Sequence, residues 1–226
     1  MSEPARMAPD HPRVLWFYGA DAVGKSTVGW EAYTLLVDRG TSVAYVDTDY
    51  LSFCHPAPDD PAAVVAENLA AVWGVYAARG IDYLVVSGIV VTAGDRDRFD
   101  ASIPSAGFTY CRLTASDETV RRRIIARREA EAATRGSTVD AELREELVAY
   151  GDRSVDFAAL LERVALEDFT LSTDARTPRE IADEAIRRLM DRRSRSVAAS
   201  STQDDVAQHD VGRSLSSSPA GPADAG

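Results

Sequence analysis

The 226-residue sequence predicts a three-layer α/β fold, in which a five-stranded parallel sheet lies between helices. Two observations support this class. Short apolar runs, typical of buried strands, alternate along the chain with longer segments of helical periodicity. Hydrophobic residues make up 45% of the sequence, which is enough to build the core of one domain.

The expected strands are short and apolar, and they lie at 14–18, 42–46, 83–86, 108–113 and 169–172. Gly, Asp-Pro and Thr-Pro signals delimit the expected helices. These helices lie at 25–39, 61–80, about 117–130, 139–163 and from the Thr177 capping box to about Arg192. The sequence allows a break at Gly151 in the fourth of them. We expect a flexible N-terminus at 1–12, one domain at 13–192 and a disordered, Ser- and Ala-rich tail at 193–226.

Composition disfavours several classes of protein. A net charge of −11 disfavours a nucleic-acid or anionic-membrane surface. No apolar run has the length of a membrane helix, and the first residues lack the apolar core of a signal peptide, so we expect a cytoplasmic protein. Cys54 and Cys111 follow no metal-binding spacing and are expected to be reduced thiols in or near the core.

A glycine-rich loop follows the first expected strand and opens the first expected helix. Its sequence, GADAVGKST, fits the phosphate-binding pattern G-x-x-x-x-G-K-[ST], known as the P-loop. In such a loop backbone N–H groups face the phosphates, the lysine reaches the β- and γ-phosphates, and the serine hydroxyl binds Mg²⁺. The sequence therefore predicts a P-loop NTPase fold that binds ATP and Mg²⁺ through Gly19, Ala20, Asp21, Ala22, Val23, Gly24, Lys25, Ser26 and Thr27.

The lysine of this loop, Lys25, is the only lysine in the chain. The other 24 of its 25 basic residues are arginines, which indicates a bias that replaces lysine wherever arginine will serve. A compact ammonium and a broad planar guanidinium differ physically. The single lysine therefore favours a function that arginine cannot supply at this position.

Three reaction classes share such a loop. A GTPase switch needs a lysine in its guanine-binding element, and the chain has none outside the loop. A dedicated ATPase usually ends an apolar strand with Asp or Asp-Glu, whereas the third strand here ends at Ser87. A small-molecule kinase fits best, and a P-loop ATPase or a nucleotide-binding regulatory protein is the alternative.

The second expected strand ends in VDTDYL, which places Asp47 and Asp49 two residues apart at the carboxyl edge of the sheet, where ligands bind. Alternate residues of an extended segment face the same way, so both carboxylates are expected to face the cleft. Either one could accept a proton or hold Mg²⁺ through water. The competing interpretation is a turn or a helix cap.

The P-loop, the Asp-x-Asp-aromatic-Leu segment and an arginine-rich helix after the fourth strand resemble the small-molecule P-loop kinases over about residues 12–192. Adenylylsulfate kinases, gluconate kinases and chloramphenicol phosphotransferases are the nearest forms. The resemblance implies transfer of the γ-phosphoryl group of ATP to a hydroxyl group, with Asp49 as the candidate base and Asp47 supporting Mg²⁺. Ser87 departs from the pattern, because many relatives carry an acidic residue there.

The arginine-rich helix carries Arg123 and Arg127 one turn apart. By resemblance, residues of about 117–138 form a lid, and these two arginines are catalytic because they meet the charge of the transferred group. The competing interpretation is a solvated helix face paired with Glu118, Glu129 and Glu131. The loop after the fifth strand is implied to pass beside the adenine, with Asp174 and Arg176 as weaker candidates.

Residues 50–80 and 88–105 are expected to surround a small-molecule acceptor. Arg96 and Arg98 would suit an anionic acceptor, or they pair with Asp95, Asp97 or Asp100 at the surface. An amino sugar, an antibiotic, a nucleoside and a sugar acid all stay open as acceptors, and a homodimer stays open as the assembly.

Overall fold

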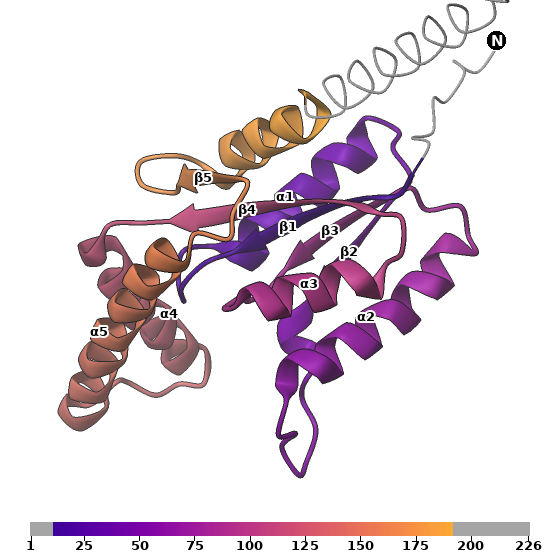
Figure 1. The fold of residues 1–226 in the computed structure, drawn as a ribbon. Coiled ribbons are helices and arrows are strands. Elements are labelled where there is room, and N and C mark those ends of the chain that lie inside the picture. The colour runs from indigo at the N-terminus through magenta and orange to yellow at the C-terminus, as the bar shows by residue number, and fades with distance from the viewer. Residues whose placement is uncertain (1–10, 192–226) are drawn as a thin grey trace, which may run out of the picture. The chain divides into compact units, whose positions relative to one another are not determined.

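The computed structural model describes residues 11–191, so the expected tail and most of the expected flexible N-terminus lie outside the described residues. Five parallel strands form one sheet in the order β2-β3-β1-β4-β5 (Figure 1). The strands are β1 (Arg13–Tyr18), β2 (Val43–Asp47), β3 (Tyr83–Ser87), β4 (Gly107–Thr114) and β5 (Phe169–Ser172). The expected five-stranded parallel α/β fold is confirmed.

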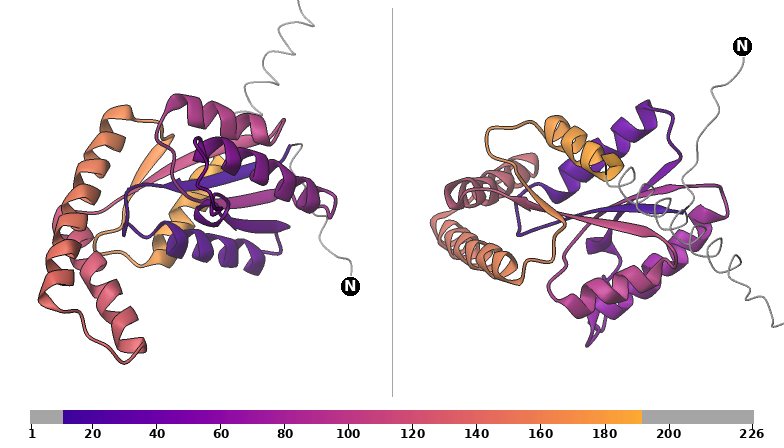
Figure 2. Two further views of the ribbon diagram at one scale, coloured as in Figure 1. Left: turned by 90° about the horizontal axis from the view of Figure 1, so that it is seen from below. Right: turned by 45° about the horizontal axis from the view of Figure 1, so that its top comes forward.

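Helices cover both faces of this sheet (Figures 1 and 2). They are α1 (Lys25–Asp38), α2 (Pro61–Ala77), α3 (Ala93–Ser102), α4 (Asp117–Thr134), α5 (Ala141–Val164) and a final helix that begins at 178 and continues to at least 191. Helices α2 and α3 lie together on one face and α1 lies on the other, whereas α4 and α5 pack side by side beyond the sheet.

The helix caps follow the sequence signals. Asp60 caps α2 through the N–H of Ala63, and Thr177 and Glu180 form the expected capping box of the final helix. The expected break at Gly151 is absent, and α5 is continuous. A Cβ at Gly151 would lie 3.1 Å from the side chain of Arg121, so this glycine allows close packing of α5 on α4.

Two short elements differ from expectation. Helix α3 has a polar sequence with only Phe99 buried, so it shows no apolar periodicity. A single 3-10 turn, η1 (Thr48–Tyr50), directly follows β2. It replaces the extended conformation expected for the segment that contains the two aspartates.

The core is built on β1, whose residues 14–18 are buried. Trp16 stacks on Phe99 of α3 with ring centroids 4.7 Å apart, and on Tyr110 of β4 at 5.8 Å. Cys111 is buried in this core as expected, whereas Cys54 is exposed in the loop after η1. Within residues 11–191 no helix is long and apolar enough to cross a membrane.

The sheet register places several polar segments at one edge. Phe17 of β1 and Asp47 of β2 both pair with Ser87 at the end of β3. The P-loop, η1 and the Ser87-Gly88 turn therefore leave the sheet side by side. This is the edge at which ligands bind in open α/β sheets.

Candidate active site

The P-loop spans residues 19–24, between the last residue of β1 and the first residue of α1. Gly24 precedes α1 with a φ of 99°, in the left-handed region that glycine occupies at least cost. Helix α1 therefore begins at Lys25, and its first N–H groups face the loop. This is the geometry in which a helix N-terminus favours an anion.

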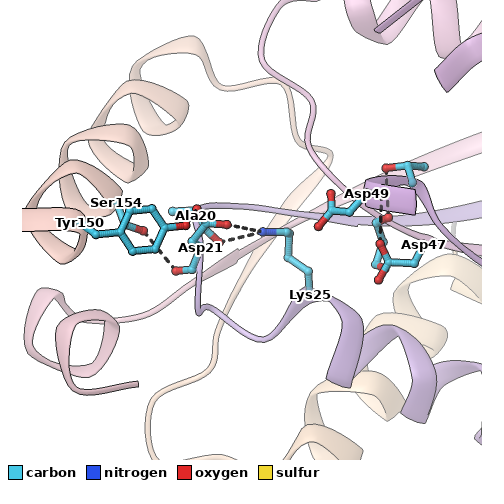
Figure 3. A network of polar contacts seen from close by, with 9 residues as sticks. Ala20, Asp21, Lys25, Asp47, Asp49, Tyr150 and Ser154 are labelled. Atoms are coloured by element: carbon cyan, nitrogen blue, oxygen red, sulfur yellow. Dashed lines mark hydrogen bonds and ion pairs between the residues drawn. The ribbon is translucent and has the colours of Figure 1, made fainter. Parts of the chain in front are cut away.

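Lys25 lies across the loop and is 7% exposed. Its ammonium donates a hydrogen bond to the carbonyl of Ala20 at 3.1 Å and pairs with a carboxylate oxygen of Asp21 at 3.6 Å (Figure 3). Figure 3 also shows Asp49 on the side of the ammonium opposite to Asp21. The only lysine of the chain therefore lies between two carboxylate-bearing segments.

Helix α5 holds the loop from the other side. The Tyr150 hydroxyl donates to the Asp21 carboxylate at 2.5 Å, and the Ser154 hydroxyl donates to the Asp21 carbonyl at 3.3 Å. Burial, followed by the hydrogen bond to Asp21, raises the pKa of Tyr150 to about 12. The sequence analysis did not find these two residues, because nothing in the pattern of α5 distinguishes them from other polar positions.

A cleft of about 400 Å³ opens over the loop. It brings together residues from five separate segments of the chain, namely residues 21–28, Asp49, Arg123 and Arg127, Thr173 and Arg176, and Pro178 and Ile181. Gly19 and Ala20 do not line this cleft and instead face a smaller cavity between the loop, β4 and α5. The other predicted loop residues, 21–27, line the same cleft as the two predicted arginines, Arg123 and Arg127.

Arg123 and Arg127, the two predicted site residues of α4, are held differently. Arg123 donates to the Ala22 carbonyl at 3.3 Å, to the Thr173 hydroxyl at 2.9 Å and to the Thr173 carbonyl at 3.0 Å. It therefore joins α4 to the P-loop and to the loop after β5. The Arg127 side chain is 65% exposed, with one distant ion pair of 4.0 Å to Glu131. Its guanidinium is free to approach an anion in the cleft.

The two aspartates after β2 point in different directions. Asp47 caps η1 by accepting the N–H of Asp49 at 3.1 Å, and its other oxygen accepts from the Tyr45 hydroxyl at 3.3 Å. Only Asp49 lines the cleft. The expectation that both carboxylates face the cleft is wrong, because η1 turns the chain where an extended segment was assumed.

The Asp49 carboxylate is open to solvent but is bordered by protein. Partial burial raises its pKa above the ordinary value, Lys25 opposes this shift, and the negative charges of Asp47 and Asp21 add to it. The side chain accepts no hydrogen bond from residues 11–191. It is therefore a carboxylate whose lone pairs are available to a ligand.

A buried contact fixes η1 beside β3. The Thr48 hydroxyl donates to the Ser87 carbonyl at 3.2 Å, and a Cβ at Gly88 would lie 1.8 Å from that hydroxyl oxygen. The Ser87 hydroxyl is 2.7 Å from that of Tyr45. Ser87 therefore takes part in a hydroxyl network that positions η1.

The oxygen atoms near the loop are suited to Mg²⁺, which prefers hard oxygen ligands and keeps several waters. Ser26 is exposed and lines the cleft. The Tyr45 hydroxyl approaches both the Ser26 carbonyl, at 3.5 Å, and Asp47. Across residues 11–191 no three side chains of His, Cys, Asp or Glu form a metal-binding group.

A second cavity of about 410 Å³ lies on the other side of η1, and Asp49 lines it as well. The arginines expected here are already paired. Arg98 donates to both oxygens of Asp60 at 3.0 and 2.8 Å. Arg96 lies 4.5 Å over the Tyr110 ring and 3.6 Å from Asp168. Neither arginine lines the cavity, and neither pairs with the expected neighbours on α3.

The candidates in the loop after β5 have separate roles. Asp174 accepts from the N–H and the hydroxyl of Ser116, at 2.8 and 3.3 Å, and so holds the start of α4. Arg176 lines the cleft and donates to Glu184 at 2.7 Å. Of the two, only Arg176 is placed to contact a ligand.

Fold and site together define a three-layer α/β protein of the P-loop type. No family model matches the chain, and no curated protein is matched by its sequence. Solved structures do match. A gluconokinase from Sinorhizobium meliloti 1021 aligns with 22% identity and a TM-score of 0.53, over 84% of this chain and 98% of its own.

Two further structures align to a similar extent. The APS kinase of Mycobacterium tuberculosis, in complex with AMPPNP and APS, has 23% identity and a TM-score of 0.51, over 81% of this chain and 99% of its own. A sugar kinase from Janibacter sp. HTCC2649 has 16% identity and a TM-score of 0.51, over 78% and 92% of the two chains. The expected resemblance to small-molecule P-loop kinases is confirmed for the fold.

Proposed function

We propose that the protein is a kinase that transfers the γ-phosphoryl group of ATP, with Mg²⁺, to a hydroxyl group of a small molecule. One observation carries the proposal: Asp49 lines both the P-loop cleft and the second cavity. Transfer between two bound molecules needs adjacent sites with a proton acceptor between them. Hydrolysis would need only the first site.

Lys25, Ser26 and the two arginines that line the P-loop cleft each have a role in this reaction. Lys25 exchanges its contacts with Ala20 and Asp21 for the phosphates, whose charge it neutralises together with the loop N–H groups. Arg123, fixed at the base of the lid, and Arg127, at its exposed face, meet the charge that spreads over the transferred group. Ser26, with support from Asp47, would hold Mg²⁺, which would neutralise further phosphate charge.

Asp49 orients the acceptor hydroxyl and takes its proton. The transition state of phosphoryl transfer is loose, so positioning contributes at least as much as basicity. The APS kinase of similar fold was solved with two ligands, AMPPNP and APS, in agreement with two sites in this architecture.

We further infer that residues 13–192 form the kinase domain and that residues 117–138 close over the nucleotide. Helix α4 continues to Thr134, so only a short connection to α5 is left to serve as the hinge. The loop 135–140, which contains Gly136, joins α4 to α5. Closure would bring the exposed Arg127 guanidinium onto the phosphates.

The test is to incubate the protein with ATP, Mg²⁺ and pooled small alcohols, and to search for products heavier by one phosphoryl group. ADP release that depends on an acceptor supports the kinase. Equal release without any acceptor would favour the P-loop ATPase, and nucleotide binding without turnover would favour a regulatory protein. Lys25→Ala is the control for turnover that depends on the cleft.

A further inference from the structure

The second cavity is the acceptor site of the kinase proposed above, and its walls indicate the class of acceptor. We propose that the acceptor is a cationic alcohol, a small molecule that carries a protonated amine besides the hydroxyl group to be phosphorylated. This inference rests on the proposed function. It narrows an acceptor that the sequence left open between amino sugars, antibiotics, nucleosides and sugar acids.

The charge on the cavity wall has one sign. No lysine, arginine or histidine lines the cavity, and the four charged residues that do so are Asp49, Asp59, Asp60 and Asp95. A polar or apolar cavity with a single sign of charge concentrates ligands of the opposite sign. An anionic acceptor would meet like charges in this site, which is an effective means of rejecting it.

Three of these carboxylates are not neutralised by the protein. Asp60 is saturated by Arg98 and by the N–H of Ala63. Asp95 accepts only the N–H of Thr92, at 3.0 Å, on one of its oxygens. Asp59 has neither a hydrogen bond nor an ion pair with any residue from 11 to 191. Together with Asp49, these groups leave oxygen atoms available to an ammonium.

Arg96 and Lys25 do not neutralise the carboxylates of the cavity wall. Arg96 is occupied by the ring of Tyr110 and by Asp168, and it does not line the cavity. Lys25 lines only the P-loop cleft, on the far side of Asp49. With ATP bound, its charge would be directed to the phosphates.

The carboxylates do not indicate a metal centre. No group of three metal-binding side chains occurs within the described residues 11–191, so the four are too dispersed to surround one ion. Between them lie the apolar side chains of Val65, Ile89, Val91 and Phe99. A wall of dispersed carboxylates and apolar groups fits an organic cation with a carbon framework. A volume of about 410 Å³ accommodates a molecule of sugar size.

Two exposed aromatic residues in the loop beside the cavity also favour an organic cation. Tyr50 is 73% exposed and Phe53 is 78% exposed, and their ring centroids are 5.9 Å apart. Tyr50 directly follows Asp49 and Phe53 directly follows Ser52, and both Asp49 and Ser52 line the cavity. Aromatic faces attract organic cations in addition to burying apolar surface.

The experiment uses the full chain with ATP and Mg²⁺ and three matched sets of acceptors near neutral pH: amino alcohols and amino sugars, their neutral polyol analogues, and hydroxy acids. Phosphorylated products are identified by mass, and KM is then measured. We expect phosphorylated products from the amines. Their kcat/KM should exceed that of the neutral analogues by about tenfold or more, which is the contribution expected from one partly buried ion pair. Added salt should reduce this preference.

Asp59→Asn tests the wall directly. It should raise KM for a cationic acceptor about three- to tenfold and leave KM for its neutral analogue unchanged, because one screened ion pair is lost. Asp97→Asn is the matched control, since Asp97 lies exposed on α3 and does not line the cavity. A merely structural role of Asp59 would change both acceptors equally, and that result would overturn the inference.

The two proposals fail in distinguishable ways. Phosphorylation of neutral or anionic alcohols without preference for amines overturns the cationic acceptor and leaves the kinase intact. If ATP binds but no product appears, the amines are titrated by calorimetry in the presence of a non-hydrolysable ATP analogue. Binding that Asp59→Asn weakens supports the inference, and no binding refutes it. Absence of any ATP binding overturns the proposed function itself.

Discussion

The substitution Asp49→Asn separates catalysis from binding, because it removes a charge and a proton acceptor while it keeps the shape of the side chain. The Asp49 carboxylate supports no hydrogen bond within residues 11–191. The cap of η1 uses only its backbone N–H, which donates to Asp47 at 3.1 Å. The fold and the P-loop should therefore be unchanged. The affinity for ATP should not fall, because the change removes a negative charge that faces the phosphate site.

The expected loss follows from the position of Asp49 between the two cavities. A positioned general base contributes about 10²–10⁴ in rate, or about 3–5 kcal/mol of barrier. In a loose transition state the acceptor proton leaves late, so we expect kcat to fall by about 10²–10³.

The pH dependence gives a second measure. Partial burial raises the pKa of Asp49 above 3.8, although Lys25 opposes the shift, and the deprotonated form is the base. Activity should therefore fall as the pH drops through that raised pKa, earlier than for an ordinary aspartate. In Asp49→Asn this acidic limb should disappear.

The assay combines ADP release with the best acceptor, calorimetry of ATP binding and the pH profile of kcat/KM. Asp97→Asn, which removes the same charge from the surface of α3, serves as the control. Transfer that stays within a few-fold of the parent would refute the role of Asp49. A parallel loss of ATP affinity would show that the residue belongs to the nucleotide site instead.

Four further substitutions test the fold and the loop. Lys25→Arg should lower kcat at least about 10²-fold, because a planar guanidinium does not fit a position that is 7% exposed; ADP release near the parent rate would contradict this. Glu167→Gln should lower the free energy of unfolding by about 3 kcal/mol in urea titrations, since it leaves the largely buried Arg112 without the carboxylate at 2.8 Å. Burial alone would raise the pKa of Glu167, but its hydrogen bonds hold that pKa below 4.5. The stabilisation is therefore present above pH 4.5. The difference in stability between the parent and Glu167→Gln should vanish as the pH falls through the lowered pKa. Gly88→Ala should displace η1, because its Cβ would lie 1.8 Å from a buried hydroxyl. Activity should fall, and the free energy of unfolding should drop by about 1–3 kcal/mol. Gly74→Ala, whose Cβ would have no atom within 4 Å, should instead stabilise α2 by about 0.5–1 kcal/mol.

The sequence predicted what depends on neighbouring residues. The P-loop is contiguous, so its glycine, lysine and serine pattern indicated both the turn and the start of α1. Strands β1 and β3 were the easiest to predict, because each is an almost uninterrupted apolar run in a buried parallel sheet. The Thr177 capping box and the Asp60-Pro61 signal predicted two helix starts for the same reason.

Contacts between distant segments could not be predicted in this way. Tyr150 reaches Asp21 across 129 positions, and Arg98 reaches Asp60 across 38. The Asp-Thr-Asp segment has the pattern of an extended chain, but a buried hydroxyl contact to Ser87 accompanies a 3-10 turn. For the same reason the sequence left Arg96 and Arg98 as candidates for an anionic acceptor, whereas the folded chain presents carboxylates on that side.

The position of Lys25 also makes it a chemical reporter. The chain contains a single ε-amino group, and this group lies at the floor of the cleft. A reagent that acylates amines therefore has one side-chain target besides the α-amino group, and the mass of the peptide that contains Lys25 reports its modification. Any compound that covers the floor should protect it, so the labelling rate reports occupancy even for ligands that are never turned over.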